Sequence, residues 1–181
     1  MARLTALNPD QTEGKSKELF TAIKGKMGMV PNMMRTMGNS PAVLNGYLGL
    51  STALNSSSLT PKTRELISLM VANANGCDYC NAAHSFIGGK IGIDAALLDQ
   101  ARAGYSSDEK TNAVLEFAKA VLDTKGNVSD EVIEKFKSAG YEEEQIAEVI
   151  ASVSLSIFTN YFNNAAKTDI DFPKLASIKQ D

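Results

Sequence analysis

Near the middle of the chain, residues 65–84 read ELISLMVANANGCDYCNAAH. A helix expected over residues 61–75 should end at Asn75-Gly76, because glycine is favoured just beyond the end of a helix. We expect the next helix to begin at or just after Cys77. The stretch therefore predicts two consecutive helices joined by a tight turn, with a Cys-x-x-Cys pair where the second one starts.

Cys77, Cys80 and His84 should share one face of this second helix. Residues advance by about 100° around a helix, so Cys80 lies roughly 60° from Cys77 and His84 roughly 20° from it. The two cysteines are then close enough for a disulfide, and His84 is within reach of Cys80. Unpaired N–H groups at a helix start and a nearby histidine both lower the pKa of a thiol. The pattern indicates a thiolate that attacks a peroxide, followed by condensation of the sulfenic acid with the other cysteine.

Other interpretations of the same residues remain open. His84 is the only histidine in the chain, and a single histidine often has a structural role. The cysteines could be a pair of small buried residues. They could also bind zinc together with His84, with Glu65 or water as the fourth ligand. Because the sequence has no second Cys-x-x-Cys or Cys-x-x-His pair, we do not expect a metal. A thiol–disulfide cycle requires no organic cofactor either.

Glu65 needs a separate argument, because it precedes Cys77 by twelve residues and lies across the expected helix break. Only antiparallel packing of the two helices would bring it to His84. There it could orient the imidazole or relay a proton through water. The alternative is a solvated glutamate in the first turn of a helix that begins after Thr60-Pro61.

Helical signals dominate the rest of the chain, and no stretch alternates as a strand would. Ser40-Pro41 and Thr60-Pro61 each place a hydroxyl at a helix N-cap and proline at the first helical position. We therefore predict a compact all-α fold of many helices. The helices are expected near residues 13–25, 32–38, 41–55, 61–75, 78–88, 94–103, 107–125, 130–139 and 142–166.

Two further local patterns bear on the fold. Ser106 and Glu109 have the spacing of a capping box at the start of the helix near 107–125. Five methionines between residues 27 and 37 line a hydrophobic entrance, an interface or an ordinary core. We expect one domain over residues 1–181, with residues 1–40 as an N-terminal helical extension.

Composition limits the classes of function. The chain has 181 residues, of which 44% are hydrophobic and 22% charged, and a net charge of −3 without any basic tract, so we expect no nucleic-acid partner. The most apolar stretch, residues 146–162, contains Glu148 and three serines, and the N-terminus lacks a secretion signal. We therefore expect a cytoplasmic protein without a membrane partner, in which a cysteine pair is more often redox-active or metal-binding than a structural disulfide.

The spacing Glu-x11-Cys-x2-Cys-x3-His resembles the signature of the alkylhydroperoxidase D-like branch of the carboxymuconolactone decarboxylase family. Residues 28–32 (GMVPN), followed by Ser40-Pro41, resemble the N-terminal part of its peroxidase-related subgroup, and residues 164–173 resemble its C-terminal end. The resemblance implies an all-α fold, assembly as a homotrimer or homohexamer, and thiol-dependent peroxidase or disulfide reductase activity. The four signature positions are Glu65, Cys77, Cys80 and His84.

The resemblance also implies a role for each residue. Cys80 attacks the peroxide and Cys77 resolves the intermediate, whereas the helix dipole taken alone favours Cys77 as the more acidic thiol. His84 acts as the base, and Glu65 completes a proton relay. Tyr79 stands where the founding peroxidase of the family has a histidine, so it is an auxiliary hydrogen-bond donor but a poor base at neutral pH.

We therefore expect a thiol peroxidase that reduces hydrogen peroxide or small organic hydroperoxides. The resemblance implies that a thiol reductant, such as a dihydrolipoyl-type adaptor, regenerates the dithiol. The alternatives are a disulfide reductase or redox partner protein without peroxide turnover, a metal-binding or structural domain, and a decarboxylase-like lyase. The decarboxylase branch typically lacks the cysteine pair, which argues against lactone decarboxylation here.

Overall fold

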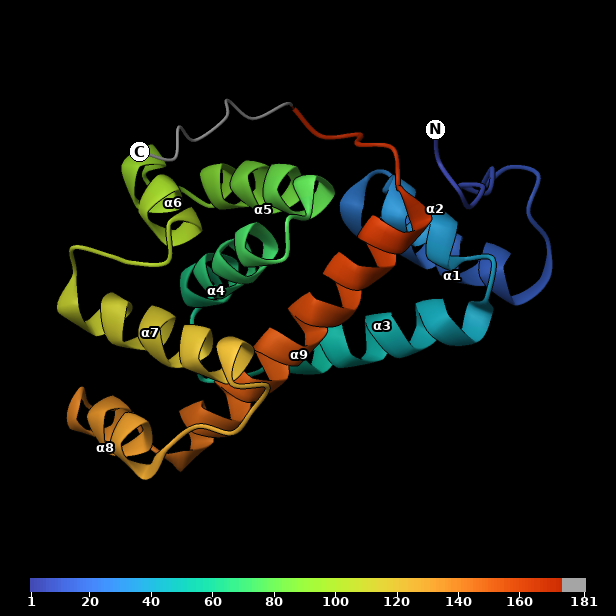
Figure 1. Ribbon diagram of the computed structural model, residues 1–181. Helices are drawn as coiled ribbons and strands as arrows, with labels where there is room; N and C mark the ends of the chain where they lie inside the picture. Colours follow the sequence, from blue (N-terminus) through green and yellow to red (C-terminus); the bar gives the residue numbers. More distant parts are fainter. Residues whose placement is uncertain (174–181) are drawn as a thin grey trace.

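The computed structural model describes residues 1–173, and this part of the chain contains nine helices and no strand (Figure 1). The predicted all-α fold is confirmed, and the helix bounds lie within a few residues of those expected. The helices are α1 (Gly14–Met27), α2 (Asn32–Met37), α3 (Pro41–Leu54), α4 (Pro61–Ala74), α5 (Asp78–Lys90), α6 (Ala95–Arg102), α7 (Glu109–Asp123), α8 (Asp130–Ser138) and α9 (Glu143–Ala166).

The starts of α3 and α4 follow the predicted capping pattern. The Ser40 hydroxyl accepts a hydrogen bond from the backbone N–H of Val43 at 3.4 Å. The Thr60 hydroxyl accepts from the N–H of Thr63 at 3.1 Å, and in both helices proline occupies the first position. These contacts satisfy N–H groups that have no partner within the helix, which fixes where α3 and α4 begin.

The capping box predicted for Ser106 and Glu109 is wrong. The N-cap of α7 is Asp108, whose carboxylate accepts from the N–H of Thr111 at 2.8 Å. Hydrogen bonds from the side chain and backbone of Thr111 hold the pKa of Asp108 below its usual value. The Ser106 hydroxyl instead accepts from the N–H of Asp108 at 3.1 Å. A carboxylate is the stronger acceptor at the positive end of a helix, so it displaces the nearby hydroxyl from the capping position.

The larger hydrophobic core surrounds α4, which packs against α5, α6, α7 and α9. Figure 1 shows α4 enclosed by these helices. Burying each large aliphatic or aromatic side chain contributes about 1.5–3 kcal/mol, so α4 is held firmly on several sides. The core residues include Leu66, Ile67, Leu69, Met70, Leu115, Phe117, Val149 and Val153.

A second core forms around the cysteines and is built largely from the N-terminal helices. Its buried members include Phe20, Met33, Met34, Met37, Leu44, Cys77, Tyr79 and Cys80. Residues 1–40, expected as an N-terminal helical extension, thus supply side chains that enclose the Cys-x-x-Cys turn. Among residues 1–173, no helix combines the length and apolar character needed to cross a membrane.

The position of α4 leads to a stability prediction. Ile67 is fully buried, so Ile67→Ala should lower the free energy of unfolding by about 2–5 kcal/mol in urea denaturation. Ile91→Ala is the matched control, because Ile91 is 48% exposed and should change stability by less than about 0.5 kcal/mol. Equal effects of the two substitutions would contradict the central position of α4.

Candidate redox site

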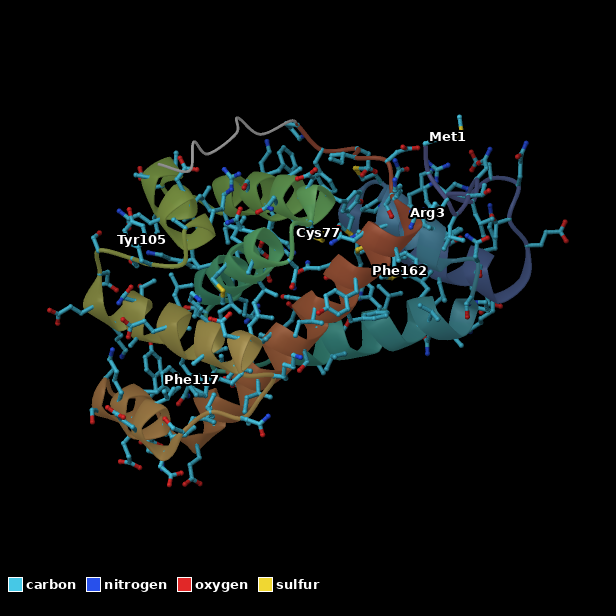
Figure 2. All side chains as sticks on the ribbon, viewed as in Figure 1. Met1, Arg3, Cys77, Tyr105, Phe117 and Phe162 are labelled. Carbon is cyan, nitrogen blue, oxygen red and sulfur yellow. A yellow bond between two sulfur atoms is a disulfide. The ribbon has the colours of Figure 1, made fainter. Side chains whose placement is uncertain are left out.

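The site begins at the turn between α4 and α5. The chain reverses at Gly76, whose φ of 58° lies in the left-handed region that favours glycine, and Cys77 is the N-cap of α5. The predicted helix break at Asn75-Gly76 is confirmed. A disulfide joins Cys77 to Cys80, with Cα atoms 5.3 Å apart. Figure 2 shows Cys77 where the chain passes from α4 into α5. The turn therefore holds the two sulfurs in bonding contact at the start of α5.

The two sulfurs accept hydrogen bonds from different donors. Cys77 Sγ accepts from the backbone N–H of Cys80 at 3.2 Å. Cys80 Sγ accepts from the side-chain amide of Asn163 on α9, with Nδ2 at 3.3 Å. Cys77 is completely buried and Cys80 is 2% exposed, so bulk water does not compete with these donors for the sulfur atoms. Both donors stabilise negative charge on sulfur when the disulfide opens.

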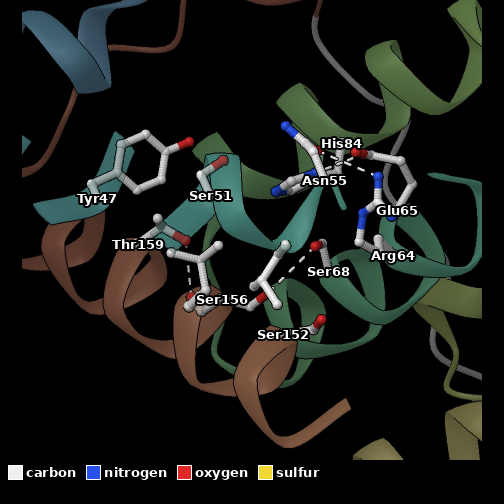
Figure 3. Close-up of a pocket in the computed structure, with 12 residues that line it drawn as sticks. Tyr47, Ser51, Asn55, Arg64, Glu65, Ser68, His84, Ser152, Ser156 and Thr159 are labelled. Atoms are coloured by element: carbon white, nitrogen blue, oxygen red, sulfur yellow. Dashed lines mark hydrogen bonds and ion pairs between the residues drawn. The ribbon is translucent and has the colours of Figure 1, made fainter. Parts of the chain in front are cut away.

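Glu65 and His84 meet across the two helices. Glu65 Oε2 lies 2.8 Å from His84 Nδ1, and the side chains are 18% and 25% exposed (Figure 3). Glu65 is near the start of α4 and His84 is at the middle of α5, so the contact is the one expected from antiparallel packing of the two helices. The alternative of a solvated glutamate is wrong. With Nδ1 bonded to the carboxylate, Nε2 is the nitrogen left free to accept a proton.

Two cavities meet at His84. One, of about 90 Å³, is bordered by Cys80 and is mainly apolar, and Cys77 does not line it. The other, of about 110 Å³, is bordered by Glu65 and by hydroxyl and amide side chains (Figure 3). The apolar cavity is further lined by Met27, Pro31, Met33, Met34, Tyr47, Tyr79, Ala83, Ile87, Thr159 and Phe172, and the polar cavity by Tyr47, Ser51, Leu54, Asn55, Arg64, Ser68, Ser152, Leu155, Ser156 and Thr159. His84, together with Tyr47 and Thr159, thus lies between a cavity that reaches sulfur and a cavity that reaches the carboxylate.

Tyr79, which precedes Cys80 in the sequence, is held by two hydrogen bonds. Its hydroxyl accepts from the N–H of Met33 at 3.1 Å and donates to the Asp171 carboxylate at 2.9 Å. Asp171 also accepts from the N–H of Asn32, which caps α2, and Phe172 packs edge-on against the Tyr79 ring. Burial, with a contribution from Asp171, raises the pKa of Tyr79. The phenol therefore stays neutral and ties the disulfide turn to α2 and to the C-terminal segment.

The observed contacts also bear on metal binding. The sulfurs are bonded to each other, and His84 Nδ1 is hydrogen-bonded to Glu65. Within residues 1–173, the structure contains no group of three or more His, Cys, Asp or Glu side chains placed to hold a metal ion. The arrangement described by these residues is that of a dithiol–disulfide pair with an adjacent acid–base pair.

Residues 41–124 match the model of the carboxymuconolactone decarboxylase family. This segment runs from α3 to α7. It contains all four signature residues: Glu65, Cys77, Cys80 and His84. The similarity to the carboxymuconolactone decarboxylase family is therefore shown for the segment that carries the signature.

Solved structures extend the similarity to nearly the whole fold. An uncharacterized peroxidase-related protein from Ralstonia eutropha JMP134, with an alkylhydroperoxidase AhpD core, is 22% identical, with a TM-score of 0.85 over 94% of this chain and 92% of that one. An uncharacterized peroxidase-related protein from Silicibacter sp. TM1040 is 22% identical, with a TM-score of 0.79 over 91% of each chain. The debrominase Bmp8, in a complex with 2,3,4-tribromopyrrole, is 22% identical, with a TM-score of 0.74 over 94% of each chain. No curated protein matches the chain.

The carboxymuconolactone decarboxylase segment does not contain the complete site. Asn163 lies on α9, Met33 on α2 and Asp171 after α9, all outside residues 41–124. Sequence analysis assigned no function to Asn163 or Asp171, and it included Met33 only in the group of five methionines. Asn163 is 83 positions from Cys80, so no helical periodicity relates the two, and only the packing of α5 against α9 brings them together.

The contacts of Tyr79 lead to a prediction. Tyr79→Phe leaves Met33 N–H without its acceptor and Asp171 Oδ1 without the donor that it has in Tyr79, so it should lower the free energy of unfolding of the oxidised protein by about 1–3 kcal/mol. Tyr105→Phe is the matched control, because Tyr105 is 52% exposed and should have little effect. Urea unfolding measures both, and a Tyr79→Phe protein as stable as the control would show that these hydrogen bonds do not hold the turn.

Proposed function

We propose that the protein is a thiol-dependent peroxidase that reduces hydrogen peroxide or small organic hydroperoxides through a Cys77/Cys80 dithiol–disulfide cycle. The observation that carries the proposal is a disulfide of which Cys80, and not Cys77, borders the apolar cavity, beside the His84–Glu65 pair. The fold shared with two peroxidase-related proteins supports the same function.

The oxidation half of the cycle balances with these residues alone. The Cys80 thiolate attacks one peroxide oxygen, the O–O bond breaks, and the alkoxide leaves as an alcohol after taking up a proton. The Cys77 thiol then attacks the sulfenic acid on Cys80 and water leaves. Two thiols and one hydroperoxide become one disulfide, one alcohol and one water molecule. The product is the disulfide that the structure contains.

His84 moves the proton in this cycle. It borders the same cavity as Cys80, but among residues 1–173 no hydrogen bond joins the imidazole to either sulfur, so the proton travels through water or the substrate itself. His84 Nε2 accepts the Cys80 proton and later returns it to the leaving alkoxide. Glu65 stabilises the imidazolium through Nδ1, and the polar cavity beside Glu65 provides a route for proton exchange.

The reduction half of the cycle requires an external thiol. Since Cys80 is 2% exposed and Cys77 is fully buried, a slender thiol that enters the apolar cavity reaches Cys80 first. Cys77 then leaves as a thiolate, stabilised by the N–H of Cys80. A dihydrolipoyl-type arm has the required shape and can remove the mixed disulfide with its second thiol. A reducing compartment such as the cytoplasm suits this cycle.

We also propose that the chain assembles with copies of itself, as a trimer or a hexamer. α3 is predominantly apolar, yet Leu44 is its one buried residue in the described chain. Val43 and Leu50 on the same helix are 37% and 42% exposed. An apolar helix exposed in this way is typical of a surface that a partner covers.

A second candidate function is reductive dehalogenation of a small halogenated aromatic compound. The apolar cavity beside Cys80, with Phe172 and Tyr79 in its wall, favours a small ring, and the debrominase Bmp8 has the same fold. Two thiols and one aryl bromide would give the arene, hydrogen bromide and the disulfide. Bromide release from 2,3,4-tribromopyrrole by the reduced protein, without turnover of any hydroperoxide, would favour this function over peroxide reduction.

The roles of the cysteines lead to a prediction. With a dithiol reductant, Cys80→Ser should reduce hydroperoxide consumption to the level of the reductant alone. Cys77→Ser should still be oxidised once, and dimedone should trap the sulfenic acid on Cys80. Mass spectrometry locates the adduct. Turnover by Cys80→Ser close to that of the unsubstituted protein would refute the proposed function.

Glu65 provides a separate prediction. Glu65→Gln retains an acceptor for His84 but loses the negative charge that stabilises the imidazolium, so kcat/KM for tert-butyl hydroperoxide should fall roughly 10- to 100-fold. Glu131→Gln is the matched control, because Glu131 is an exposed residue in the first turn of α8. A Glu65→Gln protein with the same kcat/KM as the control would show that the carboxylate takes no part in the relay.

A further inference from the structure

The hydrogen bonds at sulfur raise the question of which thiol is more acidic. Cys77 is the N-cap of α5, and its sulfur accepts the N–H of Cys80 at 3.2 Å. The start of a helix stabilises negative charge, so this contact taken alone favours a thiolate on Cys77. However, Cys77 is fully buried and does not border the cavity through which a substrate arrives. A reactive Cys80 therefore needs its own source of stabilisation.

Asn163 provides such a source. Its Nδ2 lies 3.3 Å from Cys80 Sγ, and the two residues are 3% and 2% exposed. A hydrogen-bond donor in a buried site acts without competition from bulk water, which strengthens its effect on a charged acceptor. An amide remains neutral over the working pH range. It therefore favours the Cys80 thiolate without itself exchanging a proton.

The neighbours of Asn163 hold it in position. One turn earlier on α9, Asn160 Oδ1 accepts from the side-chain amide of Asn75 at 3.0 Å. One residue later, the Asn164 side chain donates to the backbone oxygen of Asn75 at 2.9 Å. Asn75 is the C-cap of α4, immediately before the turn that leads to Cys77. Two hydrogen bonds thus fasten α9 to the turn on either side of Asn163, which sets its amide opposite Cys80.

The other end of the same amide points to the same conclusion. Asn163 Oδ1 is buried and has no hydrogen-bond partner among the described residues. A buried polar group without a partner costs free energy, so packing alone gives no reason for an amide at this position. The contact with sulfur supplies that reason.

We infer that Asn163 is a positioning residue that stabilises the Cys80 thiolate and thereby makes Cys80, rather than Cys77, the nucleophile. The inference rests on the proposed cycle. In the reduced protein the Cys80 thiol gives its proton to His84, and the sulfur anion keeps the N–H of Asn163. The thiolate then attacks one peroxide oxygen, the O–O bond breaks, and the alkoxide leaves as an alcohol with the proton held by His84. Condensation of the sulfenic acid with Cys77 releases water and leaves the contact seen in the disulfide form. Asn163 neither gains nor loses a proton in any step.

The test measures the acidity of Cys80 directly, in the Cys77→Ser background, from the pH dependence of alkylation by iodoacetamide. Asn163→Leu removes the donor and should raise the pKa of the Cys80 thiol, lowering the thiolate fraction at pH 7 about tenfold. Asn163→Asp keeps the shape but places a carboxylate beside sulfur, so it should raise the pKa further. Tyr161→Leu is the matched control, because Tyr161 is on the same helix and is 60% exposed, away from both sulfurs and from the bonds to Asn75.

An alkylation profile unchanged in folded Asn163→Leu and Asn163→Asp proteins would overturn the inference, with circular dichroism checking the fold. A second measurement uses the unsubstituted reduced protein and does not depend on how the variants fold. Limiting iodoacetamide followed by peptide mapping should label Cys80 first, and preferential labelling of Cys77 would overturn the inference. Neither measurement involves a peroxide, so a Cys80 made acidic by Asn163 in a protein without hydroperoxide turnover would contradict the proposed function alone.

Discussion

The reversal of the chain between α4 and α5 determines where every reactive side chain lies. Gly76 adopts a backbone conformation that favours glycine, and α5 then packs antiparallel along α4. This single constraint places the cysteines at the start of α5 and brings Glu65 within 2.8 Å of His84. Because α4 is fixed by four neighbouring helices, the acid–base pair and the disulfide are held rigidly relative to each other.

The two cavities give different access to the two sides of the site. The apolar space at Cys80 suits an organic substrate, and the polar space at Glu65 suits exchange of protons with water. His84 borders both cavities. It can therefore accept a proton from Cys80 on one side while its other nitrogen is hydrogen-bonded to Glu65 on the other. The N-terminal helices and Phe172 close the apolar space, so parts of the chain outside the family segment determine what reaches the sulfur.

The sequence predicts the helices well where caps and turns are clearly marked. It predicts the site only for residues that lie close together in the sequence. Proline and hydroxyl caps fixed the starts of α3 and α4, whereas Ser106 and Asp108 both fit an N-cap and only the contacts of the folded chain distinguish them. The shared face of the cysteines and His84 follows from helical periodicity. Asn163 and Asp171 could not be found in this way, because their partners Cys80 and Tyr79 are more than eighty residues away.

The most direct test of the dithiol–disulfide cycle is a single turnover without any reductant. The fully reduced protein is mixed with one equivalent of tert-butyl hydroperoxide, and free thiols, tert-butanol and the disulfide are quantified together. The account predicts that both thiols disappear, that one alcohol forms per chain, and that the disulfide joins Cys77 to Cys80. Retention of both free thiols after complete mixing would contradict it.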